Sequence, residues 1–151
     1  MTVLLEGPEG IRSKVGETLG VGKWVDVTQD RINMFAEATG DRQWIHVDVE
    51  KAKDGPFGTT IAHGLLTLSM ISDLTAGLFA FRGFKMGVNY GYQKIRFPTP
   101  VPVGSKLRAS VKVLSCEDIP NGVQSVLEFT VQREGSDKPA CVAEMIFRHT
   151  L

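Results

Sequence analysis

The chain has 151 residues, the size of one domain that can bury about two-thirds of the surface its unfolded chain would expose. Lysine plus arginine and aspartate plus glutamate both number 17, so no net field directs the chain to nucleic acid or to an anionic membrane surface. Its two cysteines, Cys116 and Cys141, form no Cys-x-x-Cys pattern, and the first residues do not read as a signal peptide. We therefore expect free thiols in a cytoplasmic protein.

The first elements predicted along the chain lead to a helix end. Residues 1–20 contain four glycines and only a weak helical pattern, so they read as an N-terminal extension with no assigned role. Residues 21–27 read as a short strand. Thr28 is then placed to cap a helix with apolar residues on one side, and Gly40 is placed to end it in a left-handed conformation. Asp41 is therefore expected just beyond a helix end.

The longest apolar stretch covers residues 64–81. Five polar residues interrupt it, and one of them, Asp73, would lie near the centre of a bilayer, so a membrane span is disfavoured. Between Leu65 and Ile71 the apolar side chains occupy most faces of a helix, which is typical of a helix enclosed by other structure. The stretch therefore predicts one long buried helix, roughly 25 Å in length at 1.5 Å per residue.

An alternating pattern typical of a strand follows this helix. In residues 84–92 the apolar side chains stand at even-numbered positions and alternate with polar or small ones. The next apolar residues, Ile95 and Phe97, stand at odd-numbered positions. One extra residue near Gln93 or Lys94 would account for the change, so a β-bulge is predicted there.

Three further strands are predicted at residues 107–113, 123–132 and 140–147. The Asn121-Gly122 pair between the first two is a strong hairpin signal. About five strands, mostly joined by hairpins, and one long helix make an α+β fold in which an antiparallel sheet wraps the helix. The sequence predicts a single domain over residues 1–151.

Several familiar signatures are missing from the chain. It has no Walker phosphate loop, no dinucleotide-binding glycine motif and no serine-hydrolase elbow, which disfavours nucleotide-binding and serine-hydrolase functions, and we expect no cofactor. His46, Asp48 and His63 do have the residue types of a two-histidine, one-carboxylate iron site. The host of such a site is usually a larger all-β fold than these strands can build, so we expect no metal.

The most informative residues are Asp41 and His46, which precede the segment Ile61-Ala62-His63-Gly64 and the apolar stretch. Proton transfer next to a carbonyl needs a carboxylate and an imidazole to handle the proton, and backbone N–H groups to hold the oxygen that gains charge. The arrangement therefore predicts an acid/base pair facing a helix N-terminus. A surface pair or a local cap is the commoner meaning of such an Asp and His when spacing is the only evidence.

A wider set of motifs resembles the MaoC-like dehydratase family from about Val21 onward. This resemblance implies the hotdog fold, in which a curved antiparallel sheet wraps one long helix, and many family members are (R)-specific enoyl-CoA hydratases. The Gln43-Trp44 pair replaces the usual Asn-Pro and is similar to the nodulation protein N-like branch. The motifs are Phe35-Ala36, Thr39-Gly40-Asp41, Ile45-His46, Phe57-Gly58, Ile61-Ala62-His63-Gly64, Arg96-Phe97-Pro98 and Pro102-Val103-Gly104.

The resemblance implies hydration of a trans-2-enoyl-CoA to an (R)-3-hydroxyacyl-CoA, or the reverse dehydration. Asp41 and His46 would contact one water, and either could remove its proton. A positioned group of this kind typically contributes ~10²–10⁴ in rate. The backbone N–H of Gly64 would form the oxyanion hole for the thioester oxygen, where glycine lets a ligand approach closely.

Other residues have weaker claims to the site. Ser72 could reach the polar centre or bond back to its own helix. Asn89 and Tyr90 could line the pocket or could be ordinary sheet residues. His63 is expected to be structural, orienting its loop through a backbone bond. Four basic residues are candidates for the phosphates of coenzyme A, with none preferred: Arg82, Lys85, Arg96 and Arg108.

A single sheet of about five strands leaves its edges exposed, which is unfavourable for a monomer. Hotdog proteins resemble one another in pairing edge to edge, so a homodimer that binds an acyl-CoA thioester is expected, without nucleic acid or membrane partners. Two alternatives to the hydratase remain open: a non-catalytic acyl-thioester-binding subunit and an acyl-CoA thioesterase. The presence of both Asp41 and His46 favours the hydratase.

Overall fold

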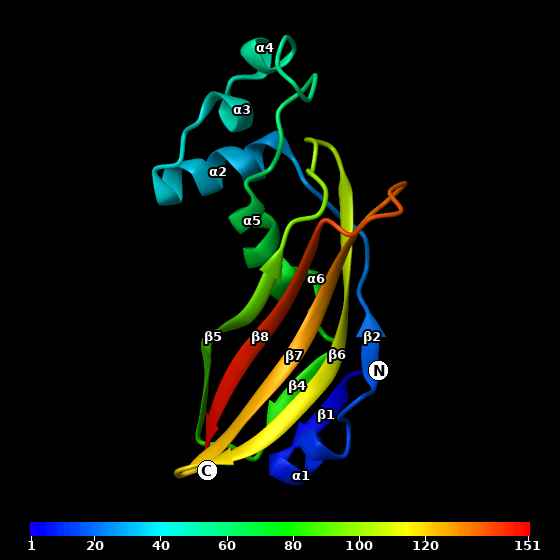
Figure 1. Ribbon diagram of the computed structural model, residues 1–151, viewed down its shortest axis with the longest axis vertical. Helices are drawn as coiled ribbons and strands as arrows, with labels where there is room; N and C mark the ends of the chain where they lie inside the picture. Colours follow the sequence, from blue (N-terminus) through cyan, green and yellow to red (C-terminus); the bar gives the residue numbers. More distant parts are fainter.

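A six-stranded sheet runs along most of the molecule, and helices lie on one side of it and at both ends (Figure 1). The computed structural model describes all 151 residues. The sheet is antiparallel throughout. Its strands are β2 (Thr18–Val21), β3 (Val25–Asp26), β5 (Met86–Arg96), β6 (Lys106–Ile119), β7 (Gly122–Arg133) and β8 (Cys141–Thr150). They pair in the order β2, β6, β7, β8, β5, with β3 beside β6.

Local signals in the sequence place three features correctly. Thr28 caps helix α2 (Gln29–Thr39) by accepting a hydrogen bond from the Arg31 N–H, and Gly40 ends the helix with a φ of 79°. Asn121 lies in the β6–β7 hairpin with a φ of 63°, which asparagine tolerates better than most residues. The predicted bulge is also present, because the register of β5 shifts between Tyr92 and Lys94.

The central helix is shorter than predicted. It consists of α5 (Gly64–Ser69) and α6 (Ile71–Leu74), which Met70 joins with helical backbone angles. The prediction of a helix over residues 64–81 is therefore wrong beyond Leu74. Gly77 has a φ of 78°, which a right-handed helix cannot accommodate, and Phe79–Arg82 forms strand β4 instead. Apolar composition does not distinguish a buried helix from a helix followed by a buried strand.

The first twenty residues are part of the packed structure rather than a loose extension. Strand β1 (Val3–Glu6) pairs with β4 in a separate two-stranded parallel sheet, and helix α1 (Gly7–Arg12) follows it. Figure 1 shows β1, α1 and β4 together at the end of the molecule opposite α2. Leu5 and Ile11 are fully buried in the main core.

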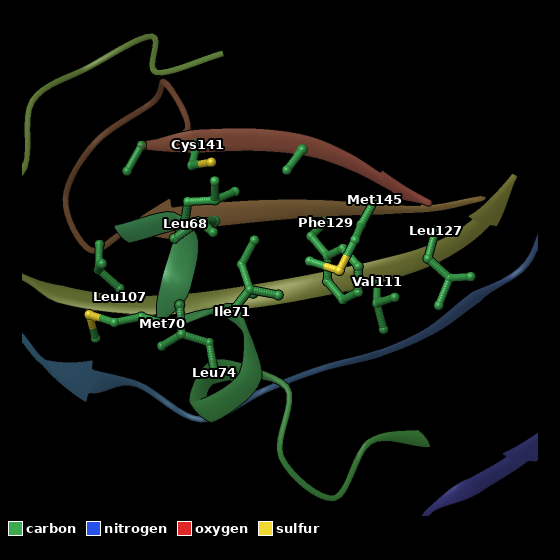
Figure 2. Close-up of a cluster of buried hydrophobic side chains, with 14 of the residues drawn as sticks. Leu68, Met70, Ile71, Leu74, Leu107, Val111, Leu127, Phe129, Cys141 and Met145 are labelled. Atoms are coloured by element: carbon green, nitrogen blue, oxygen red, sulfur yellow. The ribbon is translucent and has the colours of Figure 1, made fainter. Parts of the chain in front are cut away.

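The core lies between α5–α6 and one face of the long strands (Figure 2). Ile71 of the helical segment faces Phe129 and Met145 on the sheet, and Leu68 lies near Cys141. Alternation along β6 explains this face, because Leu107, Ala109, Val111 and Val113 are all fully buried. The packing fixes where α5 begins relative to the sheet.

Both cysteines are free, as expected. Cys141 is buried in the core, and burial raises the pKa of its thiol to about 11. The thiol therefore stays protonated and unreactive at neutral pH.

Strand β5 forms one edge of the six-stranded sheet and leaves large apolar side chains exposed. Met86, Val88, Tyr90 and Tyr92 are all at least 37% exposed. Such an edge offers unpaired backbone groups and apolar surface together, which favours pairing with another strand. No helix of the structure has the length and apolar character needed to cross a membrane.

The burial of Ile11 generates a stability prediction. Ile11→Ala removes a fully buried side chain, so the free energy of unfolding should fall by about 2–5 kcal/mol in urea denaturation. Val15→Ala is the control, because Val15 is 44% exposed and should change stability by less than about 0.5 kcal/mol. Equal effects of the two substitutions would contradict the packing of the N-terminal segment.

Candidate active site

Asp41 lies in an exposed loop immediately after the left-handed Gly40 that ends α2. Its own local bonds are long: its N–H lies 3.4 Å from the Thr39 hydroxyl, and its carboxylate lies 3.4 Å from the Gln43 N–H. The short helix α3 (Trp44–Val47) follows at once and carries His46. The carboxylate of Asp41 thus follows the end of α2, and the imidazole of His46 lies on α3, close by in the chain.

His46 is 7% exposed and is held from two sides. Its Nδ1 lies 2.7 Å from the carbonyl oxygen of Ile61, and its own carbonyl accepts a hydrogen bond from Gln29 at 2.8 Å. The Ile61 N–H also donates to the Ile45 carbonyl, so the two segments are bonded in both directions. Because a carbonyl only accepts, Nδ1 of His46 must carry the proton, which leaves Nε2 with its lone pair when the ring is neutral.

His63 lies against this pair. Its Nε2 is 2.9 Å from the backbone carbonyl oxygen of Asp41, and its ring stacks on that of His46 with centroids 3.8 Å apart and planes at 23°. Phe35 packs on His63 at 4.8 Å. The expected backbone bond of His63 is therefore present, and its acceptor belongs to Asp41.

The ligand-type atoms of Asp41, His46 and His63 all lie within 4.8 Å of one another. This cluster contains Asp41 and not Asp48, the carboxylate considered from the sequence for an iron site. Asp48 instead caps helix α4 (Val49–Ala52) by accepting a hydrogen bond from the Lys51 N–H. Two of the three ring-nitrogen and carboxylate partners are already engaged by backbone carbonyls, because Nδ1 of His46 bonds to Ile61 and Nε2 of His63 bonds to Asp41. The cluster therefore places an exposed carboxylate beside two buried imidazoles, a set of groups that can handle a proton.

Gly64 begins α5, and its N–H donates no hydrogen bond within the chain. A side chain at this position would meet the ring of Phe97 at 3.3 Å, so only glycine fits without displacing that ring. Gly64, Thr67 and Phe97 line a cavity of about 370 Å³. Asp41 and His46 do not line it, so the single chain encloses no cavity shared by the pair and the amide.

Three comparisons with known proteins bear on this arrangement. A sequence model described as a MaoC like domain matches residues 11–133. The chain belongs to the MaoC-like dehydratase family. It is 50% identical over 145 residues to 3-hydroxyacyl-thioester dehydratase Z of Mycobacterium tuberculosis, covering 95% of this chain and 96% of that one. It is 40% identical over 139 residues to nodulation protein N of Rhizobium meliloti, covering 90% and 86%.

Solved structures show the same hotdog fold. An X-ray structure described as a monoamine oxidase regulatory protein from Archaeoglobus superposes with a TM-score of 0.81 at 24% identity. The match covers all of this chain and 99% of that one. The predicted family and fold class are both confirmed.

The other three residues proposed for the site, Ser72, Asn89 and Tyr90, do not lie together. Ser72 and Asn89 line a second cavity of about 290 Å³ beside aromatic rings that include Phe129. Ser72 is exposed and makes no hydrogen bond back to its helix, so that one of its two expected roles is wrong. Tyr90 lines no cavity and lies under the guanidinium of Arg148 at 3.5 Å.

The four basic candidates do not form one patch around the pair. Arg108 stacks on Trp24 at 4.4 Å and bonds to Gln132, so its charge is already engaged. Arg96 precedes Phe97 in the chain and is the member nearest in sequence to the Gly64 cavity. Arg82 and Lys85 are exposed near the opposite end of β5.

The sequence analysis did not identify Gln29, whose hydrogen bonds hold the backbone of His46 in place. Gln29 donates to the His46 carbonyl and accepts from the Thr60 hydroxyl at 2.5 Å, which links α2, α3 and the segment before α5. Nothing in the sequence identifies this link, because a glutamine at the first position of a helix is ordinary. Its effect is to hold the backbone of α3 at a fixed place.

Proposed function

We propose that this chain hydrates trans-2-enoyl-CoA thioesters to (R)-3-hydroxyacyl-CoA and catalyses the reverse dehydration. The observation that carries the proposal is the closeness of the Asp41 carboxylate to His46, whose Nδ1–H is committed to the Ile61 carbonyl. The name of the dehydratase relative from Mycobacterium tuberculosis supports the same chemistry. The (R) configuration follows from the resemblance of the motifs to (R)-specific hydratases.

The reaction needs three contributions, and the chain offers a group for each. A water held between Asp41 and Nε2 of His46 would lose a proton to one of them as its oxygen bonds to C3 of the enoyl group. C2 would then gain a proton from the same pair. The electron density that moves onto the thioester oxygen during the addition would be stabilised by the free N–H of Gly64.

A substrate must bring its thioester close to both the pair and Gly64. The cavity beside Gly64 is apolar in most of its lining and wide enough for a thioester and neighbouring methylene groups. Ser72 and Asn89 would contribute polar groups to the second cavity, where aromatic side chains could contact an acyl chain. We assign Tyr90 no contact with substrate.

The assay follows loss of the conjugated enoyl absorbance with crotonyl-CoA and longer homologues, together with release of free thiol. Asp41→Asn and His46→Gln should each lower kcat by about 10²–10⁴ while the fold is retained. Asp48→Asn is the matched control, because this carboxylate caps α4 and should leave kcat unchanged. Wild-type rates in both Asp41→Asn and His46→Gln would remove the mechanism.

The same assay separates the alternatives. Release of free coenzyme A, with the carbon–carbon double bond of the acyl group left intact, would identify a thioesterase. Binding of acyl-CoA with neither reaction would identify a non-catalytic subunit.

We further propose that the active form is a homodimer paired through the exposed edge of β5. Its unpaired backbone and apolar side chains would be covered by a second copy, which could also cover the exposed Asp41. We also place the protein in the cytoplasm, consistent with its two free cysteines.

Sedimentation at micromolar concentration should show a dimer for the wild type. Val88→Lys, on the edge strand, should shift the chain toward monomer because it adds charge to the contact. Met34→Lys is the control, since Met34 is 66% exposed on α2, away from β5. A monomeric wild type, or equal dissociation of the two variants, would contradict the proposed interface.

A further inference from the structure

His63 is a buried, titratable residue that the proposed reaction does not use. It is 3% exposed, and three contacts surround its ring: the Asp41 carbonyl, the His46 ring and the Phe35 ring. Two of these partners are the proposed catalytic residues themselves. The placement of His63 therefore bears on how the pair is held.

The bond from His63 is the shortest one that restrains the backbone at Asp41. The other two hydrogen bonds of Asp41 are both 3.4 Å long and involve its immediate neighbours in the loop. The His63 bond is 2.9 Å long and comes from the residue that precedes α5. It therefore ties the exposed carboxylate loop to the rigid central segment.

The ring of His63 also supports His46. The two imidazoles are stacked at 3.8 Å, and Phe35 closes the other side of His63 at 4.8 Å. Rotation of His46 about its side chain would have to displace this ring. Stacking on His63 and the hydrogen bond to Ile61 together fix the orientation of the His46 ring, and with it the direction of Nε2.

The unpaired atom of His63 is consistent with this arrangement. Its Nδ1 is buried without a hydrogen-bond partner. Because the Asp41 carbonyl can only accept, Nε2 must carry the proton, and Nδ1 of the neutral ring is then left as an unused acceptor. A buried unpaired acceptor is costly, so a side chain chosen only for packing would be apolar here.

We propose that His63 is a positioning residue for the reaction: it donates from Nε2 to the Asp41 carbonyl and stacks under His46, and so fixes the carboxylate relative to the imidazole. This inference rests on the proposed function of Asp41 and His46. It assigns His63 no contact with substrate and no proton transfer. Its effect is on the geometry of the pair, where a displacement of about 1 Å can cost ~10² in rate.

Two substitutions separate the bond from the ring. His63→Phe keeps an aromatic ring to stack on His46 but loses the donor, and should lower kcat by about 10- to 100-fold with little change in KM. His63→Gln places an amide N–H near the position of Nε2 and should recover most of that loss. Ile11→Ala serves as the control for reduced stability, because it weakens the core far from the site and should retain wild-type kcat.

Wild-type kcat in His63→Phe would overturn the inference, and so would equal losses in His63→Phe and His63→Gln. A rise in KM with unchanged kcat would instead mean that His63 binds substrate, which also overturns it. A wild-type protein without hydratase activity is a separate outcome, because it removes the proposed function itself.

A measurement independent of activity covers the case in which His63→Phe does not fold. ¹⁵N chemical shifts of the wild type, recorded at a pH where imidazole is neutral, report which ring nitrogen of each histidine is protonated. The chain has only three histidines, so the His63 signals are assigned by their loss in His63→Gln. The inference requires the Nε2–H form of His63, and the Nδ1–H form would overturn it.

Discussion

The hydrogen bond from Nδ1 of His46 to the carbonyl of Ile61, 2.7 Å long, joins the two segments on which the site is built. One segment runs from the end of α2 through α3 and carries both members of the acid/base pair. The other leads into α5 and ends at the free N–H of Gly64. Without this bond the imidazole could change both its direction and its protonated nitrogen, and the carboxylate would have no fixed partner.

The sheet makes that connection rigid. The Ala62 N–H donates to Val101, and the Val103 N–H donates to Thr60, so the segment before α5 is bonded to the chain that leads into β6. Thr60 in turn bonds to Gln29 on α2. Backbone bonds on one side and a glutamine on the other hold His46, which is buried, while Asp41 is exposed. The cavity beside Gly64 is lined by neither Asp41 nor His46, so the proposed reaction requires the substrate to bridge these two places.

Features that depend on only a few neighbouring residues could be predicted from the sequence. Thr28 and Gly40 set the ends of α2, Asn121 marks a hairpin, and a change of parity locates the bulge before Lys94, because each depends on local backbone chemistry. The spacing of Asp41 and His46 could likewise be recognised. The length of the central helix could not, because residues 79–81 are apolar whether they continue a helix or form a strand that pairs with β1.

Contacts between distant residues were also hidden from the sequence. The expectation for His63 was a backbone bond with no named acceptor, and only the folded chain shows that the acceptor is Asp41, 22 residues away. Gln29 gave no signal, since its bonds to Thr60 and His46 depend on how α2 packs. The N-terminal twenty residues likewise gain a role only through the burial of Leu5 and Ile11.

The central claim is that His46 is held in one tautomer with Nε2 free to face the carboxylate of Asp41. The most direct test is the ¹⁵N spectrum of His46 in the wild-type protein under conditions where its ring is neutral. The account predicts the Nδ1–H tautomer, which is the minor form of free histidine, so its observation would be informative. A predominant Nε2–H tautomer would mean that the bond to Ile61 is not made and would contradict the account.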